Sequence, residues 1–326
     1  MKYILTLFLL LSTFFMQTFP ALPDDPYKTL ENYPTLNYQT SFNQDQIKYK
    51  NITPTEIKYN ANTTLIGCIL SSNWNEQLLH PASTNNQFIS SIFDSIQFNN
   101  QRISNITSQQ TIFYKNKFRS IHFFNSKFHN TQFYKSSFNN VLFSHSTFTG
   151  SDFSSNHIDQ LLFLNCSIDT QTKETLPTHA IIGFENFEKH LKSSPRIKHF
   201  QFNHIPFNKI NLNSIKSLNN TYNYCTFNKV SLINSIFESN TIFLCDLTSN
   251  NMYNSQFTNT TLSFIEVKNT SFNKSKFKNS SIKHSTFKNC KFDNTLWDNV
   301  TIEESTFINC TFENITTTNI KLIHSN

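Results

Sequence analysis

Apolar residues recur every five positions through most of this chain of 326 residues. Stepping by five from Phe88 to Ile168 crosses seventeen positions, and all but one of them are apolar. A second series runs from Phe202 to Leu322, and only two of its twenty-five positions are polar. Since 37% of the residues are hydrophobic overall, chance would fill little more than a third of these positions. Such a regular internal repeat indicates a solenoid.

The period of five fits neither regular element. In an α-helix, five residues turn the chain by about 500°, so successive apolar side chains would not share one face. In a flat strand, an odd step moves the side chain to the opposite face each time. The pattern is satisfied if the chain turns a corner within every five residues and presents the same side chain inward.

The positions beside each apolar centre have their own preferences. Two residues before the centre small side chains dominate, as at Ser126 and Thr131, and two residues after it Asn recurs, as at Asn279 and Asn289. Asn adopts left-handed backbone angles more readily than most residues, so it suits a corner in a chain with only 3 Gly. We therefore expect the small residue to point inward and Asn to form the corner.

Spacings of twenty predict four corners in each coil. The triplet Phe113-Tyr114-Lys115 recurs as Phe133-Tyr134-Lys135, and two pairs of Cys are also twenty apart. The predicted inward columns include Phe113, Phe133, Phe153, Phe272, Phe292 and Phe312.

Three segments carry a resemblance to a known family: Ser-Lys-Phe-His-Asn (126–130), Ser-Thr-Phe-Lys-Asn (285–289) and Cys-Lys-Phe-Asp-Asn (290–294). The chain resembles the pentapeptide-repeat family, whose motif is a small residue, Asp or Asn, Leu or Phe, and two variable residues. The resemblance implies an all-β fold, a right-handed quadrilateral β-helix. This chain departs from the motif by using Phe far more than Leu, and often Lys, Ser or Thr instead of Asp or Asn.

The chain divides into five segments. A positive start, an apolar run and Pro20-Ala21 predict a signal peptide over 1–21, with an uncleaved anchor as the alternative. An irregular N-terminal cap is expected over 22–87 and the first block of coils over 88–168. Phe184, Phe187 and Leu191 predict a short amphipathic helix in an interruption over 169–201, and the second block follows over 202–324.

The sequence indicates no catalytic or cofactor site. With so few Gly it lacks a G-x-G-x-x-G dinucleotide motif, and acidic residues are sparse, with none expected together on adjacent coils. His179, His190, His199 and His204 lie near Glu185 and Glu188, where a metal site is one reading and surface histidines the other. We expect a protein that is not an enzyme and has no cofactor or metal.

Most of the six Cys occupy the small inward position. Packed reduced thiols are one reading. The other is a pair of disulfides, Cys225–Cys245 and Cys290–Cys310, formed in an oxidising compartment if the stacked geometry permits them.

The best candidate for a ligand surface is an outward ladder of aromatic and basic residues. It comprises Tyr114, Lys115, Tyr134 and Lys135, with Lys117 and Arg119 nearby. The formal net charge of +6 is too small to indicate a nucleic-acid binder. The expected partner is a protein or an anionic envelope or host surface, and nucleic acid is not expected.

The leading hypothesis is an exported bacterial solenoid, periplasmic or extracellular, that serves as a non-enzymatic binding or structural scaffold. A secreted effector that interacts with a host is an alternative. The resemblance also implies a third function, because some family members look like duplex DNA and act on topoisomerases. Such mimicry relies on an acidic rod in the cytoplasm, which the signal segment and the positive charge of this chain disfavour.

Overall fold

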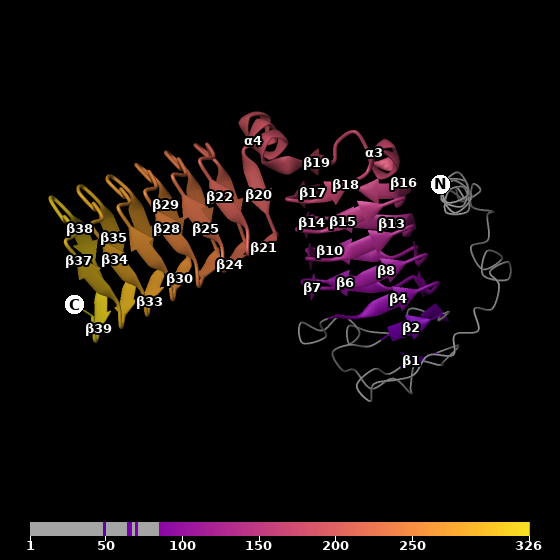
Figure 1. Cartoon of the computed structure of the whole chain (residues 1–326). Coiled ribbons are helices and arrows are strands. Elements are labelled where there is room, and N and C mark those ends of the chain that lie inside the picture. The colour runs from indigo at the N-terminus through magenta and orange to yellow at the C-terminus, as the bar shows by residue number, and fades with distance from the viewer. Residues whose placement is uncertain (1–47, 50–63, 67–68, 71–84, 326) are drawn as a thin grey trace, which may run out of the picture. The chain divides into compact units, whose positions relative to one another are not determined.

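The chain folds into two stacks of parallel β-coils separated by two short helices (Figure 1). The computed structural model describes residues 48–49, 64–66, 69–70 and 85–325. The expected signal peptide (1–21) and most of the expected cap (22–87) lie outside these residues. Among the residues described, no helix is both long and apolar enough to cross a membrane.

Three sheets form the first stack. The first contains β1 (Lys48–Tyr49), β2 (Thr64–Ile66), β4 (Gln87–Ile89), β8 (Thr107–Gln109), β12 (Lys127–His129), β15 (Thr147–Thr149) and β18 (Ser167–Ile168). The second contains β3 (Ile69–Leu70), β5 (Ile92–Asp94), β9 (Ile112–Tyr114), β13 (Gln132–Asn139), β10 (Lys117–Arg119), β6 (Gln97–Asn99) and β16 (Asp152–Ile158). The third contains β19 (Ile181–Ile182), β17 (Leu161–Leu164), β14 (Val141–Ser144), β11 (His122–Phe124) and β7 (Arg102–Ser104).

Three more sheets form the second stack. The first contains β20 (Arg196–Lys198), β23 (Lys216–Leu218), β26 (Ile236–Glu238), β29 (Gln256–Thr258), β32 (Lys276–Lys278), β35 (Leu296–Asp298) and β38 (Thr316–Thr318). The second contains β21 (Gln201–Asn203), β24 (Thr221–Asn223), β27 (Thr241–Phe243), β30 (Thr261–Ser263), β33 (Ser281–Lys283), β36 (Thr301–Glu303) and β39 (Lys321–Ile323). The third contains β22 (Pro206–Asn208), β25 (Thr226–Asn228), β28 (Asp246–Thr248), β31 (Glu266–Lys268), β34 (Thr286–Lys288) and β37 (Thr306–Ile308). Single bridges such as Asn211↔Ser231 make the fourth side.

Strand pairing confirms that each coil has four corners and twenty residues. Strands β9, β10, β11 and β12 follow one another at steps of five, and β13 then pairs with β9 so that Phe133 lies over Phe113. The same step places Phe277 over Phe257 in the second stack. Every strand pair is parallel, because each coil runs in the same direction as the coil beneath it.

The Phe columns form the interior of the coils. Phe113 and Phe133 stack with ring centres 5.1 Å apart, and Phe133 and Phe153 follow at 4.6 Å. Rings of neighbouring columns meet edge to face, as do Phe128 and Phe143 with an interplanar angle of 90°. Both arrangements suit the charge distribution of aromatic rings. The five buried members of the predicted columns are Phe113, Phe133, Phe153, Phe272 and Phe292.

Phe312 is the exception among the predicted inward residues. Its ring stacks on Phe292 at 5.1 Å, so it keeps its place in the column, but 39% of the residue is exposed. It belongs to the last described coil, where no further described coil covers it. The expectation that Phe312 is buried is therefore wrong, although its register is right.

Where the residue two positions before a centre is small and polar, its side chain closes the corner of its coil by hydrogen bonds. Ser136 Oγ accepts from the Asn116 backbone N–H at 3.0 Å on the preceding coil and donates to the Phe113 carbonyl at 2.9 Å. The Asn116 side chain plays the same role one coil earlier, where its Nδ2 donates to the Phe93 carbonyl at 2.9 Å. Where a small polar side chain stands here, it gives these buried backbone groups partners, whereas Ile121 and Val230 fill the same position with apolar side chains.

The corner residue two positions after the centre adopts a left-handed backbone. Asn279 has a φ of 49° and Asn289 a φ of 53°, as expected for Asn. The same angles occur at Lys115, Tyr224 and Leu244, which lack that preference. Stacking therefore imposes the corner on whatever residue occupies this position.

The interruption contains α3 (Thr170–Thr175), β19 and α4 (Gly183–Ser193). Helix α4 buries Phe187 and Leu191, while its ion pairs Lys189–Glu185 and Lys192–Glu188 face outward. The helical interruption was expected, but its limits differ from 169–201. The second stack begins at β20 rather than at 202, because Ile197 already lies on the five-residue series.

The first stack also begins earlier than expected. Leu65 on β2 and Leu70 on β3 are five residues apart and buried, and they lie against Phe88 and Phe93. The step from Leu65 to Phe88 is twenty-three residues rather than twenty. Because of these extra residues, a search at a fixed period of five residues does not find this coil.

Substitution of a buried ring tests the packing of the column. We expect Phe133→Ala to lower the free energy of unfolding by about 3–5 kcal/mol, because it leaves a cavity between stacked rings. Phe312→Ala, at the exposed end of a column, should cost only about 1–2 kcal/mol. Urea unfolding followed by circular dichroism measures both, and equal losses would contradict the assigned burial.

Substitution of a corner hydroxyl tests the hydrogen bonds. Ser136→Ala removes the partner of two buried backbone groups and should lower the free energy of unfolding by about 1–3 kcal/mol. Ser137→Ala, at the neighbouring half-buried position on β13, is the matched control and should change it little. Similar losses in the two variants would show that the hydroxyl does not hold the corner.

Candidate functional site

The expected Tyr–Lys ladder exists on the first stack, at the end of β9 and in the N-terminal half of β13. The rings of Tyr114 and Tyr134 stack with centres 5.9 Å apart. Lys115 Nζ lies 4.7 Å from the centre of the Tyr114 ring, and Lys135 Nζ lies 5.0 Å from that of Tyr134. These are cation–π distances. We call Tyr114, Lys115, Tyr134 and Lys135 the Tyr–Lys ladder.

The ladder offers charge more than ring surface. Tyr114 is buried and Tyr134 half-buried, whereas Lys115 and Lys135 are exposed corner residues. Hydrogen bonding and electrostatic attraction from Tyr114, with a smaller contribution from Asp94, raise the pKa of Lys115. The ladder therefore carries two fixed positive charges one coil apart.

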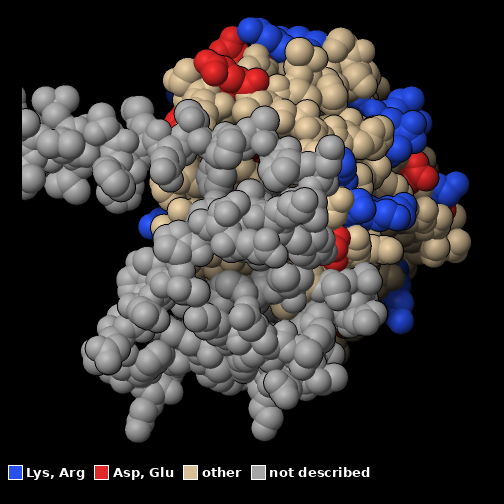
Figure 2. All heavy atoms as spheres, turned by 90° about the vertical axis from the view of Figure 1, so that its right-hand side faces the viewer, with Lys and Arg blue, Asp and Glu red and all other residues tan. Residues whose placement is uncertain are grey.

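Lys117 and Arg119 lie around the corner from the ladder. Both are exposed on β10, which pairs with the C-terminal half of β13. Figure 2 views the molecule from the right-hand side of Figure 1 and shows Lys and Arg side chains gathered on the visible surface with fewer Asp and Glu. The sequence placed these basic residues near one another, and the structure puts them on two adjoining sides of one coil.

A second ladder, which the sequence analysis missed, follows one corner of the second stack. Its side chains are His204, Tyr224, Leu244, Phe264 and His284, all at left-handed corners twenty residues apart. Tyr224 and Phe264 are each 48% exposed. The rings of His204 and Tyr224 stack at 4.9 Å, and those of Phe264 and His284 at 4.6 Å. We call this set the corner ridge.

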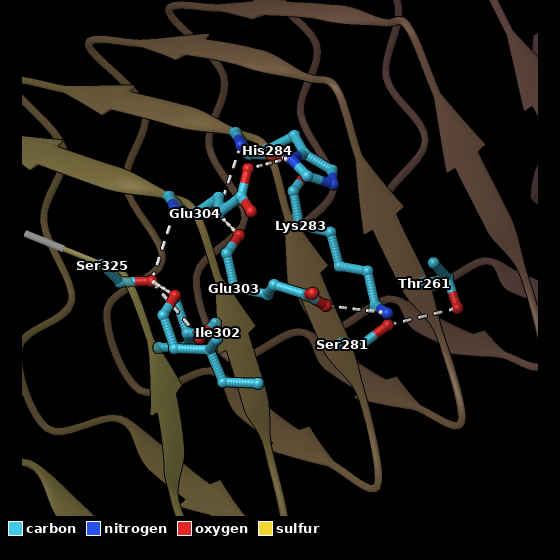
Figure 3. Close-up of polar contacts among 11 residues, drawn as sticks. Thr261, Ser281, Lys283, His284, Ile302, Glu303, Glu304 and Ser325 are labelled. Carbon is cyan, nitrogen blue, oxygen red and sulfur yellow. Dashed lines mark hydrogen bonds and ion pairs between the residues drawn. The ribbon is translucent and has the colours of Figure 1, made fainter.

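Polar pairs continue the corner ridge toward the C-terminal end of the stack (Figure 3). His284 Nδ1 lies 3.0 Å from a Glu304 carboxylate oxygen, and Lys283 Nζ lies 2.9 Å from Glu303. On the same sheet, Ser281 Oγ donates to Thr261 Oγ1 at 3.4 Å. The ridge thus changes from aromatic to charged along its length.

One expectation about carboxylates is wrong. Asp246 on β28 and Glu266 on β31 occupy paired positions on adjacent coils, beside a cavity of about 280 Å³. Glu266 is neutralised by Lys268 at 2.6 Å. Because the two acids are separated by twenty residues, their proximity follows from coil stacking and not from local sequence.

The stacked cysteines are free thiols, so the disulfides considered for Cys225–Cys245 and Cys290–Cys310 are not formed. Each sulfur instead bonds a carbonyl of the preceding coil, with Cys225 Sγ 3.4 Å from the Phe202 oxygen and Cys245 Sγ 3.3 Å from that of Tyr222. In-register residues of parallel strands point the same way and stay about 4.8 Å apart. Disulfides need Cβ atoms about 3.5–4.5 Å apart.

Burial favours the neutral thiol at Cys166 and Cys290, whereas a hydrogen bond with Cys225 lowers the pKa of Cys245. Burial raises the pKa of Cys166 to about 12 and that of Cys290 to about 11. The sixth cysteine, Cys68, lies outside the described residues. Among the described residues, no three His, Cys, Asp or Glu side chains come together as metal ligands. Of the four histidines near the interruption, His179 and His190 line one cavity, and His179 Nε2 bonds the Ile158 carbonyl at 2.9 Å.

A contact between the two stacks was also not foreseen. Leu142, Leu162 and Leu164 point outward from the first stack, yet they are buried in the apolar core of the second together with Phe187 and Phe202. We call this contact the junction. Next to it is a cavity of about 440 Å³, whose walls include His190, Arg196 and Phe200.

No protein-family model matches the chain. No curated protein matches it either. The similar solved structures include HetL, a pentapeptide-repeat protein involved in heterocyst differentiation regulation from the cyanobacterium Nostoc sp. strain PCC 7120. It is 8% identical over 72% of this chain and 90% of its own, with a TM-score of 0.29.

Two other solved structures are similar at the same level. The pentapeptide-repeat protein Rfr23 from the cyanobacterium Cyanothece 51142 is 11% identical over 42% of this chain and 98% of its own, with a TM-score of 0.29. QnrB1, a plasmid-mediated fluoroquinolone resistance protein, is 10% identical over 79% of this chain and 93% of its own, also with a TM-score of 0.29.

The fold is that of a pentapeptide-repeat solenoid. This conclusion rests on the coils themselves: a centre every five residues, four sides, twenty residues per coil and stacked Phe columns. The protein is thus a parallel β-solenoid with side chains displayed in ladders on its outside. The low identities to the three structures give no information on what it binds.

Proposed function

We propose that the protein is an exported, non-enzymatic scaffold that binds an anionic partner through the Tyr–Lys ladder. The observation that carries this proposal is the placement of Lys115 and Lys135 over stacked Tyr rings. The rings restrict two flexible side chains to one geometry before binding, which lowers the entropy cost of ordering them. Two ammonium groups one coil apart match a surface with closely spaced negative charges.

The chemistry of the ladder favours a carboxylate or phosphate surface. Lys acts as a compact point charge with three donors, and it accepts either kind of anion without a fixed fork geometry. Lys117 and Arg119 extend the positive surface onto the next side of the coil. A partner with repeated acidic groups, such as an acidic protein segment or an anionic envelope, fits this arrangement.

Export is supported by the N-terminal sequence, with its charged start and apolar run before Pro20-Ala21. A carboxy-terminally tagged chain should appear in the periplasmic or culture fraction, shortened by about two kilodaltons through removal of residues 1–21. Immunoblotting of fractions measures location and size together. A full-length product confined to the cytoplasm would overturn the proposal of export and favour an intracellular role.

Charge removal at the ladder tests the binding surface. We expect the double variant Lys115→Gln/Lys135→Gln to bind vesicles containing phosphatidylglycerol, or polyglutamate, about five- to thirtyfold more weakly than the wild type. Added salt should reduce wild-type binding, because the contacts are exposed. Surface plasmon resonance on both probes also separates a lipid from an acidic protein as the favoured partner class.

The matched control is Lys276→Gln/Lys288→Gln, which removes the same charge from exposed positions of the second stack. It should bind nearly as well as the wild type. If both double variants weaken binding equally, the attraction is a general charge effect and the ladder is not the site. If the wild type binds neither probe, the proposal of an anionic partner fails.

A further inference from the structure

A fully buried histidine lies at the junction between the two stacks. His122, on β11, points outward from the first stack and meets Asn203, on β21 of the second. Asn203 Nδ2 donates to His122 Nδ1 at 2.9 Å, and His122 Nε2 lies 2.6 Å from Ser144 Oγ. Both ring nitrogens are therefore used, one of them across the junction.

This hydrogen-bond arrangement admits only the neutral ring. Because Asn203 donates to Nδ1, that nitrogen carries no hydrogen, and Nε2 donates to Ser144 Oγ. The Asn203 amide is held in this orientation by Asn223 Nδ2, which donates to Asn203 Oδ1 at 3.0 Å. With the amides in this orientation, a proton on Nδ1 would place two donors against each other, and the bond that joins the stacks would be kept only if Asn203 and Asn223 both turned over.

The groups that face His122 from neighbouring elements either carry a positive charge or gain one when they bind a proton. They are Arg102 on β7, His145 after β14 and His204 after β21, and Tyr224 lies beside Arg102. The Arg102 guanidinium lies 4.8 Å from the centre of the Phe124 ring. That ring is 5.3 Å from His145 and 5.2 Å from His204. None of these groups is a carboxylate, so a protonated His122 would gain no counterion from them.

Burial, followed by the nearby positive charges, holds the pKa of His122 well below its ordinary value. Burial also lowers the pKa of His145 and of His204. A histidine with a lowered pKa stabilises the closed contact above its ordinary pKa of about 6.5, and that contribution is lost as the pH falls below this value. The contact between the stacks is therefore weakened in acid and strengthened near neutral pH.

We propose that the junction is an acid-sensitive contact: it holds the two stacks together while His122 is neutral and opens when His122, His145 and His204 take up protons. Opening would uncover Leu142, Leu162 and Leu164, which the second stack covers at neutral pH. The coils of each stack would stay intact, because their cores consist of aromatic, aliphatic and thiol side chains that gain no charge in acid. The acid response would thus change the contact between two rigid bodies.

The test is a distance measurement on the full chain. Donor and acceptor dyes on unnatural amino acids at the exposed positions Lys127 and Lys288 report energy transfer between the stacks as pH falls from 7.5 to 5. Each histidine that binds a proton only in the open form should lower the ratio of closed to open molecules about tenfold per pH unit below 6.5. By pH 5 this amounts to about thirtyfold. Circular dichroism should stay constant over the same range.

Variants assign the response to the junction. His122→Gln keeps an amide donor and acceptor but cannot titrate, so energy transfer should depend much less on pH. His145→Gln/His204→Gln should shift the midpoint of opening to lower pH. The matched control, His129→Gln/His157→Gln, changes two exposed histidines of the first stack and should behave as the wild type.

The wild-type protein alone can also overturn the proposal. Nuclear magnetic resonance of the histidine ring protons should give His122 an apparent pKa below 6.5, coupled to the change in energy transfer. If the His122→Gln variant is open at every pH, the titration of His122 in the wild-type protein decides whether the junction is acid-sensitive. Unchanged energy transfer down to pH 5, an ordinary His122 titration, or a His122→Gln response equal to that of the wild type would each refute an acid-sensitive junction.

Discussion

The whole structure depends on holding each corner against the next coil by backbone hydrogen bonds, as the Lys115 N–H does with the Tyr134 carbonyl. The backbone at each corner turns through left-handed angles, as at Asn279 and Leu244, and leaves N–H and carbonyl groups that face the interior. At many corners a small polar residue satisfies these groups, as Ser136 does for Asn116 and Phe113, and at others an apolar residue such as Ile121 or Val230 fills the position. One large ring per side then fills the space within the coil. Stability therefore comes from contact between coils and not from any single repeat.

The two stacks use the same corner but differ in what fills the centre. Phe dominates the first stack, where stacked and edge-to-face rings form one network around Phe128, Phe133 and Phe143. The second stack mixes Phe with aliphatic side chains and holds Trp297 against Phe277. Aromatic rings and aliphatic side chains fit the same place because the coil fixes the backbone spacing and leaves the side chain to fill the remaining volume.

The sequence predicted the features that repeat and missed those that occur once. The inward columns, the four-cornered coil and the Asn corners could be predicted because each is repeated along the chain. The junction joins His122 to Asn203, and nothing in either segment indicates which outward side chain will meet which. The corner ridge escaped notice because Tyr224 and Phe264 lie at positions assigned to solvent. The cysteine pairs were considered for disulfides because a spacing of twenty shows that they stack but does not give the distance between their side chains.

The permissive corner has an evolutionary consequence. Stacking imposes left-handed angles on Lys, His, Tyr and Leu as well as on Asn. The residues at the outer positions can therefore change by mutation without loss of the fold. A chain that diverged in this way would keep its inner columns and little else. Selection could rewrite the exterior of such a molecule, including the corner ridge, while its interior stays fixed.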